Sequence, residues 1–394
     1  MALEFEVSAP GKVILHGEHS VIYGFPAVAG PIGLRTSLRC SPQSDPVVTF
    51  EFLSIPFTSS LTMVAFNEFL AEFDCYGTLQ PEQFLHQMRN PEGPFPFARF
   101  VRTQPSSAEG TKDRFSLGAA LYIVNRVLRA EGVQSIGLPG GFTLSFSSAM
   151  SIGAGLGSSA SFGVCLGAGA YALAQMIHGK PVNFDDDVVR EKVTRWAFDC
   201  EVLMHEKPSG IDNTIATYGK LIRFRRGDPA HQTVALRHPV PILIVDTGVS
   251  RSTAKLVAIN AKRRELYPRT VGPILESMGG LVEEAIGWYE SDQVEPAATV
   301  YERLGTLVAI NNNLLRSLGV SHPALEKIFA LAEQHGYASK LTGAGGGGCA
   351  FILLPPNYRE QQSFRLLDQA LRDAGFNTIE TTIADGQGVS FQAK

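Results

Sequence analysis

The sequence predicts an α+β protein of two domains, and three observations lead to that prediction. The chain has 394 residues, roughly twice the common size of a single domain. Stretches that alternate as strands do are interspersed with longer stretches that have apolar residues at helical spacing. A polar stretch after Arg223 precedes a fresh buried strand, PVPILIVDTG. We therefore place a domain boundary near residue 235, which gives domains at 1–235 and 236–394.

Strands of the first domain are predicted from alternation and from apolar runs bounded by turn residues. Pro10-Gly11 separates the first two of them. A segment rich in proline and charge, 88–113, is predicted to be an exposed loop. The predicted strands are residues 4–9, 12–15, 47–53 and 142–147.

Three helices are predicted in the first domain. The first covers 115–131, where apolar residues recur at helical spacing, and the second follows the glycine-rich loop GAGLGSS. A third covers about 186–206, because three aspartates at 185–187 suit a helix N-terminus. Pro208 and Gly210 are expected to end it.

The second domain is predicted to begin with the strand PVPILIVDTG and to continue mainly as helices. A glycine loop then runs into a strand within LTGAGGGGCAFILL at 341–354. One or two strands are expected at 377–391. The predicted helices are 252–266, 271–290, 296–317, 322–336 and 358–375.

Composition and charge exclude several classes of protein. Apolar residues make up 44% and charged residues 18% of the chain, as is typical of a soluble globular protein. The net charge of −4 argues against a protein that binds nucleic acid over its whole surface. The opening MALEFEVSAPGK is unlike a signal peptide, and the apolar run at 160–177 is short for a membrane span. We expect a cytoplasmic protein with no nucleic-acid or membrane partner.

The cysteines give no disulfide pattern. Their number is odd, no CxxC pair occurs, and several lie in apolar runs, so buried free thiols in a reducing compartment are expected. They are Cys40, Cys75, Cys165, Cys200 and Cys349.

The segment MSIGAGLGSSASFGVCL at 150–166 has glycine at three alternate positions before a predicted helix. Small residues let successive backbone N–H groups face one concavity, and such a nest before a helix N-terminus binds anions, phosphate above all. Ser158 and Ser159 can cap the helix or reach a metal on the phosphate. The alternative is tight helix packing that needs only small side chains.

Two common phosphate loops fit this segment poorly. The P-loop requires Gly-Lys-Ser/Thr, and no lysine is present. GLGSSA at 155–160 formally meets the dinucleotide pattern GxGxxG/A. No Asp or Glu occurs between Gly153 and Phe184 to bind a ribose. A dinucleotide-dependent oxidoreductase is therefore the less favoured alternative.

A second glycine cluster covers Gly343–Gly348, next to a predicted strand. A flexible linker fits poorly there, and close approach of the backbone to a ligand fits better. Two glycine loops in two domains predict a cleft with a phosphate chain between them.

Several charged side chains are candidates for phosphoryl-transfer chemistry, which needs a metal-holding carboxylate, a cation and a group that orients the acceptor. Glu201 falls beside the apolar face of the 186–206 helix, where either a salt bridge or a metal would be its partner. Asp212 follows a Pro-Ser-Gly turn, either as a site residue or as a helix cap. Lys12, Glu18 and His19 are, by composition alone, ordinary surface or loop residues.

Three segments, in chain order, resemble the motifs of the GHMP kinases, a family that includes galactokinases, homoserine kinases, mevalonate kinases and phosphomevalonate kinases. They are APGKVILHGEHSVIYG at 9–24, GAGLGSSAS at 153–161 and SKLTGAGGGGCAF at 339–351. WAFDCEVLMHEKPSGIDN and VDTGVSRSTAKLV are similar to segments of the mevalonate kinase branch in particular. The resemblance runs from residue 5 to about 355.

The resemblance implies a fold, a reaction and a set of partners. The first domain would be like domain 2 of ribosomal protein S5, the second ferredoxin-like, and two chains would form a homodimer. The enzyme would use ATP and Mg²⁺ to phosphorylate the C5 hydroxyl of mevalonate. A cytoplasmic location follows, with a peroxisomal fraction as an addition.

The resemblance also implies roles by position. Asp212 would be the general base and Lys12 would stabilise charge beside it. Ser159 and Glu201 would hold Mg²⁺. Residues expected at the ATP phosphates are Lys12, Ser148, Gly153, Ala154, Gly155, Leu156, Gly157, Ser158 and Ser159. Residues expected at the acceptor are Glu18, His19, Asp212, Arg251, Thr253 and Ala344.

Two further alternatives stay open at this point. Another GHMP sugar or alcohol kinase would differ in the acceptor pocket, and a catalytically silent member would lack Lys12, Glu201 or Asp212, all of which are present. The segment 54–60 does not supply the asparagine that helps hold the nucleotide in relatives, so the adenine contacts are not assigned.

Overall fold

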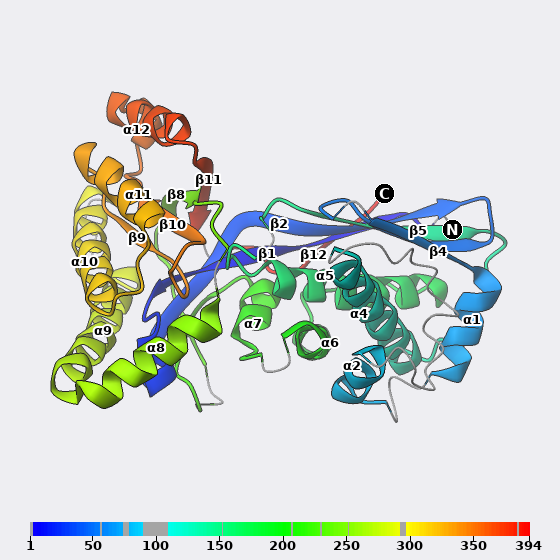
Figure 1. The fold of residues 1–394 in the computed structure, drawn as a ribbon. Coiled ribbons are helices and arrows are strands. Elements are labelled where there is room, and N and C mark those ends of the chain that lie inside the picture. Colours follow the sequence, from blue (N-terminus) through cyan, green and yellow to red (C-terminus); the bar gives the residue numbers. More distant parts are fainter. Residues whose placement is uncertain are drawn as a thin grey trace.

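A computed structural model describes the chain except for residues 1–2, 56, 74–78, 90–108, 152, 206–207, 229–230, 251, 292–296 and 384–385. Within the described residues, one mixed sheet of 12 strands runs through the whole molecule. Its main path has the order β4-β3-β5-β2-β11-β8-β10-β9. Helices α1, α2 and α4–α7 lie on one face of its N-terminal part, and α8–α12 pack at its other end (Figure 1). The α+β class is therefore confirmed.

The sheet is centred on two long antiparallel strands, β1 (Phe5–His16) and β2 (Ala27–Gln43). The two strands expected at 4–9 and 12–15 are one bent strand, because Pro10-Gly11 causes a register shift and not a break. Glycine is required at position 11, since an added Cβ would lie 2.7 Å from the carbonyl oxygen of Leu156. This close approach brings the first glycine loop against β1.

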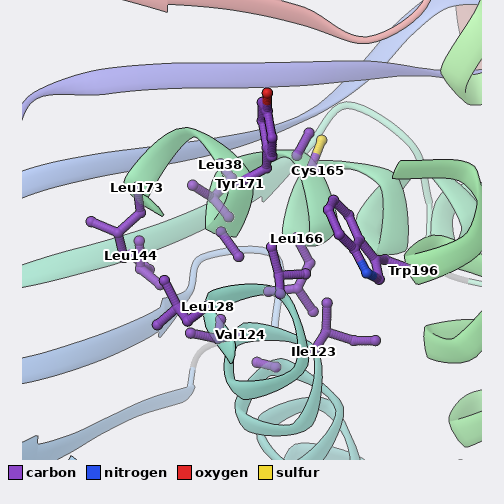
Figure 2. Packing of buried hydrophobic residues seen from close by; sticks show 14 of the residues in the cluster. Leu38, Ile123, Val124, Leu128, Leu144, Cys165, Leu166, Tyr171, Leu173 and Trp196 are labelled. Carbon is purple, nitrogen blue, oxygen red and sulfur yellow. The ribbon is translucent and has the colours of Figure 1, made fainter. Parts of the chain in front are cut away.

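The rest of the N-terminal part covers one face of β1 and β2. Apolar side chains of the sheet pack against α4, α5 and α6, and Figure 2 shows Leu166 and Trp196 in that core. The elements are β3 (Val47–Phe52), β4 (Phe57–Thr62), α1 (Met63–Glu72), α2 (Pro81–Arg89), α4 (Glu109–Ala130), β5 (Gly141–Ser148), α5 (Ser158–Ile177), α6 (Asp187–His205), α7 (Ile211–Tyr218), β6 (Leu221–Phe224) and β7 (Gln232–Val234).

The C-terminal part extends the same sheet. β11 pairs with β8 along its length and meets β2 at Ile383 and Ile32, which joins the two parts. The last strand, β12 (Ser390–Ala393), returns to pair with β1, so the end of the chain completes the N-terminal part. The boundary near residue 235 stays a prediction. The elements are β8 (Val240–Asp246), α8 (Thr253–Leu266), α9 (Pro268–Tyr289), α10 (Ala297–Ser317), α11 (Pro323–Gln334), β9 (Ser339–Leu341), β10 (Cys349–Leu353), α12 (Gln362–Asp373) and β11 (Asn377–Ile383).

The bounds predicted for the loop at 88–113 are wrong at both ends. Residues 88 and 89 end α2, and residues 109–113 begin α4, while 90–108 lie outside the described residues. The charged and proline-rich composition of this segment masked the helix ends in the sequence pattern. The strands β2, β4, β6, β7 and β9 and the helices α1 and α2 were not predicted, and a helix after Asp212 was considered only as one that this residue would cap.

Two expectations about apolar residues are confirmed. Among the described helices, α5 alone has the length and hydropathy of a membrane span, and 83% of its apolar window is buried inside the protein. It is the core helix that the sequence indicated. Four cysteines are free and buried, whereas Cys75 lies outside the described residues; the four are Cys40, Cys165, Cys200 and Cys349.

Candidate active site

A cleft of about 680 Å³ lies where the two glycine loops face each other. Its walls come from β1 and the segment after it, from the loop before α5, from α6 and α7, and from the start of the second glycine loop. Residues far apart in the sequence, such as Lys12, Glu201 and Ala344, therefore line one space.

The first glycine loop presents backbone to this cleft. Gly153, Gly155 and Gly157 line it and have φ of 80°, 83° and 76°, values that favour glycine. The side chains between them, Ala154 and Leu156, are buried in an apolar cluster. The buried side chains of Ala154 and Leu156 anchor one side of the loop, and the three glycines leave bare backbone on the side that faces the cleft. Any contact of Ala154 or Leu156 with a ligand would be through the main chain.

The serines that follow lie inside the helix. Gly157, and neither serine, is the N-cap of α5, and no side chain caps the helix. The expectation that Ser158 or Ser159 caps α5 is therefore wrong. Both serines line the cleft in the first turn of α5, and Ser148 lines it at the end of β5. Uncapped N–H groups at the N-terminus of a 20-residue helix suit an anion.

Lys12 and Asp212 form an ion pair across the cleft. The Lys12 Nζ lies 3.1 Å from Asp212 Oδ2. Lys12 is only 8% exposed, so the surface alternative for it is wrong. Asp212 lies in the first turn of α7, but Gly210 is the N-cap and no side chain caps the helix. The capping alternative for Asp212 is therefore wrong as well, and its carboxylate is available to the cleft.

Glu201 of α6 is a buried carboxylate that faces the same space. It is 5% exposed and makes no ion pair with the residues that the structure describes. The pKa of Glu201 is raised to about 8, first by burial and second by the negative charge of Asp212, while the positive charge of Lys12 acts in the opposite direction. A carboxylate in this position lacks a compensating cation.

Glu201 and Ser159 are the residues of the cleft that would hold a divalent cation. Both line the cleft, and carboxylate and hydroxyl oxygens are ligands that Mg²⁺ accepts together with phosphate oxygens and water. The described residues contain no cluster of three or more His, Cys, Asp or Glu that could hold a metal by themselves. A site with few protein ligands is what Mg²⁺ shared with a phosphate chain needs.

Glu18 and His19 are buried in the wall of the same cleft, so they are not ordinary loop residues. Glu18 is ion-paired with Lys340 of β9. The His19 Nε2 lies 2.8 Å from the carbonyl oxygen of Ala344, and its Nδ1 lies 3.2 Å from Asn260 Nδ2. An amide N–H donates to Nδ1, so Nε2–H donates to the carbonyl.

The second glycine loop meets the cleft only at its start. Gly343 and Ala344 line the cleft. The later glycines lie against the chain itself: an added Cβ would be 2.1 Å from the carbonyl oxygen of Val320 at Gly345, and 2.7 Å from that of Val249 at Gly347. Thr253, in the first turn of α8, lines the cleft beside this loop, whereas Arg251 lies outside the described residues.

One end of the cleft is apolar, and the sequence analysis did not identify it. Phe52 and Phe146 stack with their ring centroids 5.2 Å apart, and Phe162 lies 5.0 Å from Phe146. Ile55 and Met204 complete this wall. A flat heteroaromatic ring fits such a surface. Alternation in VVTFEFLSI was the available signal, but it shows only that Phe50 and Phe52 share a face.

Comparisons with known proteins show the family to which the chain belongs. The family described as "GHMP kinases N terminal domain" matches residues 119–220, and "GHMP kinases C terminal" matches residues 296–371. A mevalonate kinase of Aspergillus fumigatus is 36% identical over 100% of this chain and 74% of its own length. The human mevalonate kinase is 32% identical over 98% of this chain and 94% of its own length.

Solved structures show the same fold. A Leishmania major mevalonate kinase in complex with R-mevalonate has a TM-score of 0.67 and 23% identity, covering 96% of both chains. The Methanococcus jannaschii mevalonate kinase also has a TM-score of 0.67, with 21% identity, covering 96% of this chain and 98% of its own. A two-domain GHMP kinase fold is thereby confirmed.

Proposed function

Since the chain belongs to the GHMP kinases, and within them to the mevalonate kinases, we propose that it transfers the γ-phosphoryl group of ATP to the C5 hydroxyl of mevalonate. The observation that carries this proposal is the pair of Lys12 and Asp212, 3.1 Å apart, in the cleft that the first glycine loop lines. A cation and a carboxylate beside an anion-binding loop are the groups that an alcohol kinase needs.

The proton of the acceptor hydroxyl goes to Asp212. Its carboxylate lies in the cleft, is not used as a helix cap, and is held by Lys12 on one side. Accepting the proton as the oxygen attacks phosphorus makes the oxygen a better nucleophile. The Lys12 ammonium lies beside the same point and stabilises negative charge on the phosphoryl group in transfer.

The phosphate chain lies along Gly153, Gly155 and Gly157 and at the start of α5. The backbone N–H groups of the loop and of the first helical turn are the donors. Ser159 and Glu201 would hold Mg²⁺, which would supply positive charge next to the phosphate oxygens.

The adenine base of ATP and the acceptor substrate bind at the two remaining ends of the cleft. The apolar wall of Phe52, Phe146 and Phe162 takes the adenine ring. The acceptor lies near Glu18, His19, Thr253 and Ala344, with Arg251 suited to a carboxylate. Because both ring nitrogens of His19 are engaged in contacts with the protein, this side chain shapes the acceptor pocket.

An assay of acceptors side by side tests the proposal. Purified protein with Mg·ATP should form ADP only when mevalonate is added, and not with phosphomevalonate, homoserine or galactose. The Asp212→Asn protein, prepared in parallel, is the control for a contaminating kinase. Turnover of homoserine or galactose in place of mevalonate would contradict the acceptor and leave the kinase reaction in place.

A homodimer and a cytoplasmic location, with a peroxisomal fraction, are proposed on the same family membership. Sedimentation at equilibrium tests the first, and a dimer mass is expected. Fractionation of cells that express the chain tests the second.

A further inference from the structure

A buried ion pair lies directly behind the acceptor end of the cleft. Lys340 of β9 is fully buried, and its partner Glu18 is 1% exposed. The Lys340 Nζ also donates a hydrogen bond to the carbonyl oxygen of Leu341 at 2.8 Å and lies 5.1 Å from the ring centroid of Phe351. Glu18 lines the cleft and Lys340 does not. The lysine can therefore affect a bound substrate only through its neighbours.

The ion pair holds an unusual piece of backbone. Glu18 lies between Gly17, with a φ of 93°, and His19, with a φ of 63°. Among the described residues, His19 is the one non-glycine residue with a positive φ. Such a conformation persists only where the surroundings enforce it. Two groups surround the Glu18 carboxylate in this way. Lys340 forms the ion pair with it, and the Asn311 Nδ2 donates a hydrogen bond to Glu18 Oε2 at 3.3 Å.

The same segment is tied to the second glycine loop at two more points. The His19 ring joins the carbonyl oxygen of Ala344 to Asn260 of α8. The Thr342 hydroxyl donates to the carbonyl oxygen of Ile14 at 3.2 Å. Lys340 precedes Thr342 by two residues in the chain. The contacts Glu18–Lys340, His19–Ala344 and Ile14–Thr342 therefore form one row, which we call the seam, between the end of β1 and the start of the second glycine loop.

Stability alone does not account for this pair. Burying two charges costs much of what their attraction returns, and apolar side chains of similar volume often stabilise a core as well or better. Lys340 lies in β9, next to the second glycine loop, and its ion pair instead fixes the direction of the Glu18 carboxylate.

We propose that Lys340 is a positioning residue for the acceptor substrate: through Glu18 it fixes His19 and the Ala344 carbonyl, which shape the acceptor end of the cleft. The proposal rests on the proposed function for the identity of the acceptor. It concerns the acceptor alone and predicts that nucleotide binding is unaffected, because the contacts that carry it join residues 14–19 to β9, α8 and the start of the second glycine loop.

Steady-state kinetics of Lys340→Met test this separation of the two substrates. The KM for mevalonate should rise roughly tenfold to hundredfold, since small displacements at a reacting site have effects of that size. The KM for ATP should stay within about twofold. The control is Leu371→Ala, a cavity in the C-terminal core away from the cleft, which should lower stability and leave both KM values unchanged.

The double variant Glu18→Gln/Lys340→Met separates positioning from stability. It removes both charges, so no unpaired charge is left buried, and its urea midpoint should recover toward that of the wild type. The KM for mevalonate should stay raised, because the neutral amide introduced at position 18 has no cation to hold it. This variant carries the test by itself if Lys340→Met does not fold.

Two results would overturn the inference: an equal rise in KM for both substrates, or a normal mevalonate KM in the double variant. The wild-type protein is assayed first. If it turns over a different GHMP acceptor, the proposed function fails, and the same comparison of KM values, made with that acceptor, still decides the role of Lys340.

Discussion

The two glycine loops have similar composition and different surroundings. In the first loop, three alternate glycines face the cleft while Ala154 and Leu156 anchor the loop in an apolar cluster. In the second loop, only Gly343 among the glycines lines the cleft, and Gly345, Gly346 and Gly347 lie against Val320, Leu256 and Val249. A run of glycines thus indicates that something approaches the backbone closely, but not whether it is a ligand or the chain itself.

This difference indicates that the two walls of the cleft have different functions. The wall of the first loop carries Lys12, Asp212 and Glu201, the charged groups next to the phosphate site. The wall of the second loop is held by the chain's own contacts and supports the acceptor end through Ala344. Substitutions at the first wall should change the rate, and substitutions along most of the second loop should change stability.

The largest effect should come from Asp212→Asn at the first wall. Removing a group that accepts a proton in the transition state lowers kcat by roughly 10²–10⁴-fold. Nucleotide affinity should be retained, because the phosphate site is made by the loop and by α5. Steady-state kinetics with a nucleotide titration measure both. Full activity of this variant would remove Asp212 from the role of base.

Gly157→Ala should have the next largest effect. An added Cβ would lie 2.8 Å from the Lys12 Cγ and 3.3 Å from the Lys12 nitrogen, at a φ of 76°. The lysine stem must move, which separates its ammonium from Asp212, so kcat should fall about 10–100-fold.

Gly153→Ala is the matched control in the same loop. Its φ of 80° gives a similar backbone cost, about 1–2 kcal/mol, but its Cβ would have no neighbour within 4 Å. Equal losses of kcat in the two variants would show that backbone strain, and not displacement of Lys12, is responsible.

Gly347→Ala should lower stability and leave nucleotide binding unchanged. The added Cβ would lie 2.7 Å from the Val249 carbonyl oxygen and 2.9 Å from its Cγ1, at a φ of 129°. We expect a loss of roughly 1–3 kcal/mol in the free energy of unfolding, measured by urea denaturation. A large rise in the ATP KM without a loss of stability would mean that the second loop also binds nucleotide.

Local patterns in the sequence predicted those parts of the fold that have a clear period. The 3.6-residue period located α4, the glycine loop and three aspartates located the starts of α5 and α6, and the buried strands β8 and β10 were identified from short apolar runs. β2 was missed because Pro31 and two glycines interrupt it, and one of these glycines, Gly33, lies where the register shifts against β1.

The site was predictable only to the extent that its residues lie in motifs. Lys12, Glu201 and Asp212 were identified, and the structure brings them to one cleft. Lys340 and the aromatic wall were not, because nothing local to SKL or VVTFEF shows what faces them across the fold. Lys340 meets Glu18 from 322 residues away in the chain. Such contacts depend on topology, which a single sequence does not reveal.

The smallest effect concerns the pH dependence of stability at the second wall. His16 is fully buried at the end of β1. The Tyr289 hydroxyl lies 3.3 Å from its Nε2, and the Asn311 Nδ2 lies 3.5 Å from its Nδ1. Burial lowers the pKa of His16 well below 6.5, and the positive charge of Lys340 lowers it further. The folded protein therefore keeps this ring neutral while the unfolded chain binds a proton below about pH 6.5.

It follows that the free energy of unfolding decreases as the pH falls below about 6.5, by at most about 1.4 kcal/mol per pH unit from this one group. His16→Gln retains hydrogen-bonding capacity toward Tyr289 and Asn311 but cannot titrate. Urea denaturation at pH 7.5 and pH 5.5 should show a smaller loss of stability in the variant than in the wild type, by about 1 kcal/mol. Equal losses would mean that His16 binds its proton within the fold, and that the polar contacts behind the second glycine loop accommodate a second positive charge beside Lys340.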